Sequence, residues 1–211
     1  MPDSHIAICG TGRAGTTLLV RILRKAGLDT GFSDDDVEMT LSHPSNAGLE
    51  RTPRKRKMAE MPDVIKSPHL FEFAGTGLRE GWLKLDLMIV PVRDIDKVVK
   101  SRTSVTRMNL LQYFTKASQR GTSLRGNGGL IRGRRNIFRQ REAVLDMFFQ
   151  NIFLAVENDV SIVFLSFPRF ARDADYFMSA LLPALSAIRD IDADKLREAH
   201  ASESDTSLIR R

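Results

Sequence analysis

The stretch that decides the fold is His5–Leu19, which reads HIAICGTGRAGTTLL: a short apolar run, a glycine-rich turn and the start of an apolar helical pattern. Gly10, Gly12 and Gly15 permit backbone conformations and close approaches that side chains would block. A strand, a glycine loop and a helix in this order direct backbone N–H groups and the positive end of the helix toward one point, where a phosphate group can bind. We therefore predict a phosphate-binding loop over Gly10–Thr17.

The spacing of Gly10 and Gly15 matches a Walker A loop, but Thr16 stands where nucleotide triphosphatases carry the lysine that reaches the β- and γ-phosphates. The cation of this loop is Arg13 instead. A glycine-rich turn can also be a tight connection and nothing more, but that interpretation gives no reason for Arg13, Thr16 and Thr17 to stand beside it. The sequence favours a phosphate site unlike that of an ATP-dependent kinase.

Outward from the loop, short apolar runs alternate with helical patterns. Continuous apolar runs are typical of strands covered on both faces, and we predict four: His5–Cys9, Asp63–Lys66, Asp86–Val92 and Val160–Phe164. We predict four helices: Thr16–Ala26, a helix from Asp94 through Arg102, Asn136–Val156, and Asp173–Leu182, which Pro183 would end. This alternation indicates an α/β fold of P-loop type, with a mainly parallel central sheet flanked by helices in three layers.

Two stretches show neither pattern. Gly31–Met61 mixes acidic residues, prolines and a basic cluster, and Gln119–Arg135 holds five glycines and five arginines. We expect mobile loops over about 33–61 and 119–135 within one domain that spans 1–211. In the predicted helix Asn136–Val156, one set of apolar residues falls on a single face: Val144, Leu145, Phe148, Phe149, Ile152 and Val156.

Charge and composition limit the classes of function. The net charge is +6, but Lys97–Arg141 holds twelve Lys or Arg and no acidic residue, so the remainder carries −6; this asymmetry indicates an anionic ligand. With two Tyr and one Trp and no aromatic RNA-binding pattern, the chain does not favour a nucleic-acid partner. The apolar runs are too short for a membrane span, and the single cysteine, Cys9, excludes an internal disulfide. We expect a cytoplasmic protein.

A second motif follows the predicted strand Asp86–Val92. Arg93 stands at the end of that strand, and Ser101 comes eight residues later, about two turns into the following helix at roughly 1.5 Å per residue. A guanidinium group offers a planar fork to phosphate oxygens, and a serine hydroxyl can add a contact from the same side. Because ligands bind at the carboxyl ends of the strands in open α/β sheets, we predict a second phosphate contact here.

A third motif is Lys66-Ser67-Pro68-His69, at the end of the predicted strand Asp63–Lys66. Taken by itself, Lys66 could be a solvated charge at the strand end.

The three motifs together, over roughly Ile6 to Arg102, resemble the sulfotransferases that use 3′-phosphoadenosine 5′-phosphosulfate (PAPS). That family opens with a loop of the form Pro or Gly, Lys or Arg, Ser, Gly, Thr, Thr, and the arginine here is more similar to the tyrosylprotein and bacterial branches than to the phenol-type cytosolic enzymes. The chain departs from the form at Ala14, where the family has Ser. The resemblance implies these donor-binding residues: Gly12, Arg13, Ala14, Gly15, Thr16, Thr17, Arg93 and Ser101.

The resemblance also implies the reaction: transfer of a sulfuryl group from PAPS to a hydroxyl or amine, which releases adenosine 3′,5′-bisphosphate and needs no metal. Arg13 and Lys66 would stabilise the developing charge. The acceptor would be a hydroxylated small molecule or a carbohydrate. The base stays open between His69, Asp34 or Asp35, which follow the first helix about where the tyrosylprotein branch has its catalytic Glu, and some other group.

Two alternatives remain at this point. One is a P-loop small-molecule kinase, against which the missing lysine after Gly15 argues. The other is a non-catalytic nucleotide-binding protein that keeps the site and lacks a base. Turnover with a hydroxylated acceptor separates both from a sulfotransferase.

Overall fold

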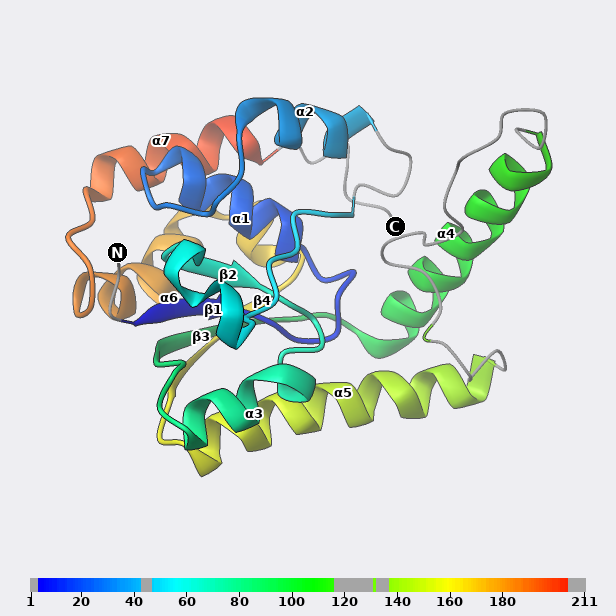
Figure 1. Ribbon diagram of the computed structural model, residues 1–211. Helices are drawn as coiled ribbons and strands as arrows, with labels where there is room; N and C mark the ends of the chain where they lie inside the picture. Colours follow the sequence, from blue (N-terminus) through cyan, green and yellow to red (C-terminus); the bar gives the residue numbers. More distant parts are fainter. Residues whose placement is uncertain (1–3, 43–46, 116–130, 132–136, 205–211) are drawn as a thin grey trace.

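Four parallel strands form the central sheet, in the order β2-β1-β3-β4 (Figure 1). The computed structural model describes residues 4–42, 47–115, 131 and 137–204. The strands are β1 (His5–Ile8), β2 (Val64–Lys66), β3 (Leu85–Val92) and β4 (Ser161–Ser166). All four coincide with predicted strands, and the predicted α/β fold with a parallel sheet is confirmed.

Helices cover both faces of the sheet, so the fold has three layers (Figure 1). Along β1 the side chains alternate between the layers: Ile6 and Ile8 belong to one core cluster, and Ala7 belongs to the other. The first cluster lies under α1 (Thr16–Lys25), α6 (Ala174–Ser186) and α7 (Ala193–Glu203). The second lies under α3 (Phe71–Arg79) and α5 (Ile137–Glu157). The remaining elements are α2 (Asp34–Ser42), α4 (Ile95–Thr115) and the 3₁₀ turns η1 (Lys55–Glu60) and η2 (Arg169–Ala171).

Helix α1 begins and ends where the sequence indicates. Gly15 precedes it with a φ of 87°, and Gly27 follows it with a φ of 103°, both in the region that favours glycine. Leu19 and Leu23, one turn apart, are fully buried against the sheet. The burial of this stripe holds the amino end of α1 over the carboxyl end of β1.

The prediction of a loop over Gly31–Met61 is wrong in two places, where α2 and η1 form. At the start of α2, Ser33 and Asp36 bond each other's backbone N–H groups, which supplies a capping box that the acidic run obscured. Helices α3 and α7 were not predicted. The predicted loop 119–135 lies outside the described residues except for Ile131, whose backbone bonds Gln140 of α5.

Pro183 does not end α6, which continues to Ser186. The last turn keeps Leu185 fully buried beside Leu181 and Phe177, and this burial outweighs the hydrogen bond that a proline removes. The single apolar face predicted for α5 is also wrong: Val144 is buried, whereas Leu145, Phe149 and Val156 are exposed. Among the described residues, no helix has the length and apolar character needed to cross a membrane.

Candidate anion-binding site

The carboxyl ends of all four strands meet at one edge of the sheet, because every pairing is parallel. The glycine loop follows β1, Lys66 ends β2, Arg93 follows β3 and Phe167 follows β4. The structure therefore brings the three motifs of the sequence together at the edge where open α/β sheets bind ligands.

The glycine loop has an unusual backbone. Gly12 and Arg13 are consecutive residues with positive φ, 61° and 57°, and Gly15 follows at 87°. Such a conformation turns successive N–H groups toward one concave side, which suits an anion. At Arg13, which is not a glycine, positive φ costs on the order of 1 kcal/mol. A β-carbon on Gly15 would lie 2.7 Å from the rings of Phe167 and Phe170, so the loop also needs glycine there for space.

The second motif contacts the loop through two hydrogen bonds. Arg93 Nη1 donates a hydrogen bond of 2.9 Å to the carbonyl oxygen of Arg13, and Arg13 Nε donates one of 3.1 Å to Ser101 Oγ. The guanidinium group of Arg93 also lies 5.2 Å from the centre of the Phe167 ring. Partial burial lowers the pKa of Arg93, although the group remains charged. Arg13, Arg93 and Ser101 thus form one polar group at the amino end of α4.

Arg102 belongs to the site although no motif assigned it there. Its side chain is buried, and Nη2 donates to the carbonyl oxygen of Thr11. A β-carbon on Gly12 would lie 3.0 Å from Arg102 Nη2, so the guanidinium group occupies the space that glycine leaves. Burial lowers the pKa of Arg102 to about 10, and the charge of Glu50 opposes that shift. In the sequence, Arg102 stands next to Ser101. Adjacent residues of a helix point about 100° apart, so this position alone did not place Arg102 at the site.

Lys66 is the most deeply buried cation of the site. Its side chain is 3% exposed, and Nζ donates to the carbonyl oxygen of Gly48 and, over 3.3 Å, to Thr17 Oγ1. Glu50 Oε1 lies 3.7 Å from Nζ. Burial lowers the pKa of Lys66, Glu50 opposes that shift and nearby Arg13 adds to it, so that the resulting pKa is about 8. Lys66 is therefore a buried lysine and not a solvated charge at the end of the strand.

Glu50 is the carboxylate that the structure adds to the site. It reaches Lys66 because the segment Gly48–Arg51 crosses the end of β2: Leu49 is buried in the core with a φ of 56°, and the Arg51 N–H donates to the Lys66 carbonyl oxygen over 2.9 Å. The Glu50 side chain is 40% exposed, so its carboxylate is accessible from solvent. Nothing in the local sequence marked Glu50, because it lies within the predicted loop.

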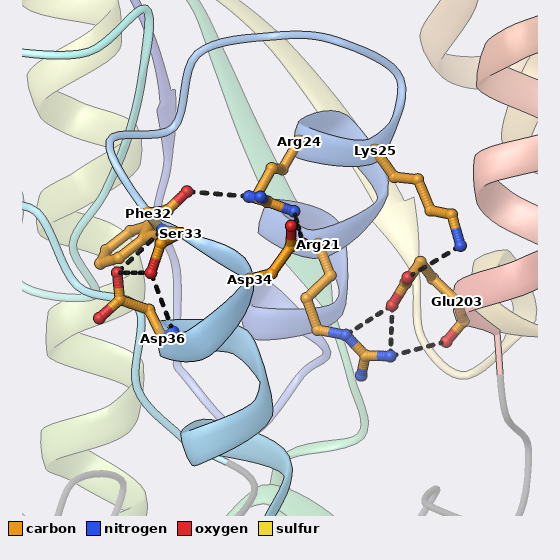
Figure 2. A network of polar contacts seen from close by, with 8 residues as sticks. All are labelled: Arg21, Arg24, Lys25, Phe32, Ser33, Asp34, Asp36 and Glu203. Atoms are coloured by element: carbon orange, nitrogen blue, oxygen red, sulfur yellow. Dashed lines mark hydrogen bonds and ion pairs between the residues drawn. The ribbon is translucent and has the colours of Figure 1, made fainter.

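Two of the three predicted bases, Asp34 and Asp35, lie in the first turn of α2. Figure 2 shows Asp34, which is 91% exposed, in an ion pair with Arg24 (2.7 Å) near the far end of α1. Arg24 is eight residues beyond Thr16, or about 12 Å along the helix, and Asp35 follows Asp34 in the first turn of α2. His69 Nδ1 lies 3.1 Å from Glu72 of α3. The structure thus places Glu50 beside Lys66, Asp34 beside Arg24 and His69 beside Glu72.

The other loop residues line the same turn. Thr16 is buried, Thr17 contacts Lys66, and Ala14 is fully buried without a hydroxyl of its own. In the described part of the chain, no group of three His, Cys, Asp or Glu residues is placed to hold a metal ion. Comparisons with models of known protein families, with curated proteins and with solved structures give no match.

The arrangement concentrates positive charge where backbone N–H groups also converge. Four cations surround the loop, and Glu50 is the carboxylate that interacts with the two buried ones, Lys66 and Arg102. Chemically, this concentration of positive charge suits an anion: Lys66 bonds Thr17, and Arg13 bonds both Ser101 and Arg93.

Proposed function

We propose that the protein is a PAPS-dependent sulfotransferase. The observation that carries this proposal is the set of contacts around the loop: Lys66 donates to Thr17, whereas Arg93 donates to the carbonyl oxygen of Arg13 and Arg13 donates to Ser101. We take Lys66 with Thr17 as one group, and Arg93 with Ser101 as a second. The first group suits the 5′-phosphosulfate of the donor, and the second suits a separate phosphate on the 3′-oxygen. A nucleoside triphosphate carries all its phosphates in one chain and would leave the second group unused.

The reaction follows from these positions. The oxygen of an acceptor hydroxyl attacks the sulfur of PAPS, the bond from sulfur to the bridging phosphate oxygen breaks, and adenosine 3′,5′-bisphosphate leaves with the electron pair. Lys66, Arg13 and the loop N–H groups stabilise the charge that grows on the leaving phosphate. A sulfuryl group carries less negative charge than a terminal phosphoryl group, so these groups take the part that magnesium plays in a kinase, and we propose that no metal is needed.

We assign the general base to Glu50. Its carboxylate lies beside Lys66, is open to solvent, and can accept the acceptor's proton while Lys66 holds the transferring group. The acceptor is a hydroxylated small molecule or a carbohydrate in this proposal.

The test is ligand-dependent thermal stability. Adenosine 3′,5′-bisphosphate at about 100 times its dissociation constant should stabilise the fold by roughly 2.7 kcal/mol. ATP and GTP at equal concentration should stabilise it less. Arg93→Ala should keep the fold and lose roughly 1.5–3 kcal/mol of bisphosphate binding, measured by isothermal titration. If ATP or GTP stabilises the protein more than the bisphosphate does, the phosphotransferase interpretation replaces this one.

A further inference from the structure

Helix α5 has apolar residues on two opposite faces. One face packs in the core through Val144, Met147, Leu154 and Ala155, all buried. The opposite face carries the α5 stripe, defined here as four large apolar residues with exposures of 50%, 61%, 45% and 65%: Leu145, Phe149, Phe153 and Val156. A helix that is apolar all round is normally buried all round. Figure 1 shows α5 at the outer edge of the molecule, and within the described part of the chain the four side chains of this second face are exposed.

The α5 stripe is suited to packing against another helix. Leu145, Phe149 and Val156, with the half-buried Ile152, are spaced by four, three and four residues, which is the spacing of a helix–helix seam. The rings of Phe149 and Phe153 stack with centres 6.0 Å apart and planes within 14°, so they offer one flat aromatic surface.

The pattern is also self-complementary. Leu145 and Val156 lie at equal distances in sequence from the midpoint between Gln150 and Asn151, and Phe149 and Phe153 lie nearly so. An antiparallel pair of α5 helices across a two-fold axis therefore sets Leu145 against Val156 of the partner subunit and the two phenylalanine pairs against each other. We infer that the α5 stripe is the interface of a homodimer formed by antiparallel pairing of α5 with α5 of a second copy of the chain.

Charge on the flanks decides against a lipid surface. Arg141 is paired with Asp96 of its own chain, and exposed Glu142 lies on the same side of α5 as the stripe. Asp146 and Glu157, both exposed, flank the stripe. Helices that bind membranes in the interfacial plane have basic flanks, so an acidic flank suits a protein contact better.

The area is that of a small dimer interface. A buried aromatic side chain covers roughly 200 Å² and a leucine or valine covers less, so these four half-exposed side chains offer at most about 400 Å² per subunit. Both subunits together bury at most about 800 Å² of apolar surface, which is below the roughly 1,200–2,000 Å² of a stable specific interface. We therefore expect a reversible dimer whose fraction depends on concentration.

Sedimentation velocity of the full chain over a concentration series tests this inference. The dimer fraction should rise with concentration, and Phe149→Asp should raise the dissociation constant more than about tenfold, because pairing would bury a charge. Met39→Asp is the matched control: Met39 is 66% exposed on α2, on the opposite side of the molecule in Figure 1, and its replacement should leave the dimer unchanged. A chain that stays monomeric throughout, or a dimer that Phe149→Asp leaves intact, overturns the inference.

Chemical cross-linking tests the direction of pairing independently. The single native cysteine is buried, so a thiol introduced at Leu145 or Val156 is the accessible one. With a short bifunctional maleimide, a mixture of Leu145→Cys and Val156→Cys chains should cross-link far more than either variant alone. Equal or stronger cross-linking within Leu145→Cys alone would show parallel pairing and refute the antiparallel dimer.

Discussion

Replacing Lys66 by methionine distinguishes a lysine that serves a ligand from one that serves the fold. A pKa lowered from 10.5 to about 8 in a side chain that is 3% exposed corresponds to roughly 3 kcal/mol of unfavourable free energy for the charged form. Methionine has a similar length and no charge, so Lys66→Met removes this penalty. It also leaves the Gly48 carbonyl oxygen without its donor, which costs about 1–2 kcal/mol.

The two effects leave a net stabilisation of about 1–2 kcal/mol at pH 7, or a rise in melting temperature of roughly 2–8 °C for a chain of this size. The gain should depend on pH. Below about pH 8 the wild-type lysine is charged in both states and the penalty is complete; between about 8 and 10.5 the folded state has released the proton and the unfolded state still binds it, so wild-type stability rises. The advantage of Lys66→Met should therefore shrink as pH rises through this window.

Binding should change in the opposite direction. Lys66→Met loses a charge-assisted contact with the 5′-phosphate, and its affinity for adenosine 3′,5′-bisphosphate should fall by about 10- to 100-fold. Calorimetric unfolding at several pH values and isothermal titration measure the two effects. Lys55→Met is the control: Lys55 forms an exposed pair with Glu80, and its loss should change stability by less than about 1 kcal/mol and leave the affinity unchanged. A Lys66→Met protein that is destabilised by about 2 kcal/mol or more, with normal affinity, would show that Lys66 serves the fold.

Three further predictions concern the same site. Glu50→Gln should lower turnover by at least about 100-fold with bisphosphate affinity retained, whereas Asp34→Asn should change neither; equal turnover of Glu50→Gln and wild type would exclude Glu50 as the base. Gly12→Ala places a β-carbon 3.0 Å from Arg102 Nη2 at a residue with positive φ. Urea unfolding should therefore show a loss of about 1–2 kcal/mol of stability, and titration should show a weaker affinity for the bisphosphate. No change in either quantity would mean that the Arg102 side chain moves to make room. Turnover should survive excess chelator, and a rate that collapses and recovers with magnesium would favour a phosphotransferase.

The sequence predicts those parts of the site that depend on short-range pattern. Lys66 and Arg93 each stand at the end of an apolar run, and parallel strands bring such ends together whatever the details of packing. Glu50 and Arg102 depend on long-range packing instead. Glu50 reaches Lys66 because Leu49 enters the core and the Arg51 N–H bonds the end of β2, and the direction of Arg102 depends on how α4 is rotated about its axis.

The same distinction explains the errors in the helices. Pro183 is an unfavourable residue for a helix interior, and only the burial of Leu185 against the first core cluster shows why α6 continues past it. In α5, the apolar residues are numerous enough to form two faces, and periodicity alone does not tell which face meets the sheet. The face chosen from the sequence combined Val144, which is in the core, with Phe149, which is exposed.

Several residues at the glycine loop are energetically unfavourable for the fold. This gives a reason to regard the loop as functional, and the reason does not depend on any resemblance to a known family. Arg13 holds a backbone conformation that glycine adopts at no cost, and Lys66 and Arg102 are buried charges whose pKa values are lowered because burial disfavours the charged forms. A single substitution, for example Arg13→Gly or Lys66→Met, would remove one of these unfavourable contributions to the free energy of folding. A connection between β1 and α1 that served only the fold would gain stability from such changes. A preorganised anion site, in contrast, requires both backbone strain and desolvated positive charge at the carboxyl edge of the sheet. The bound anion then supplies the missing counter-charge.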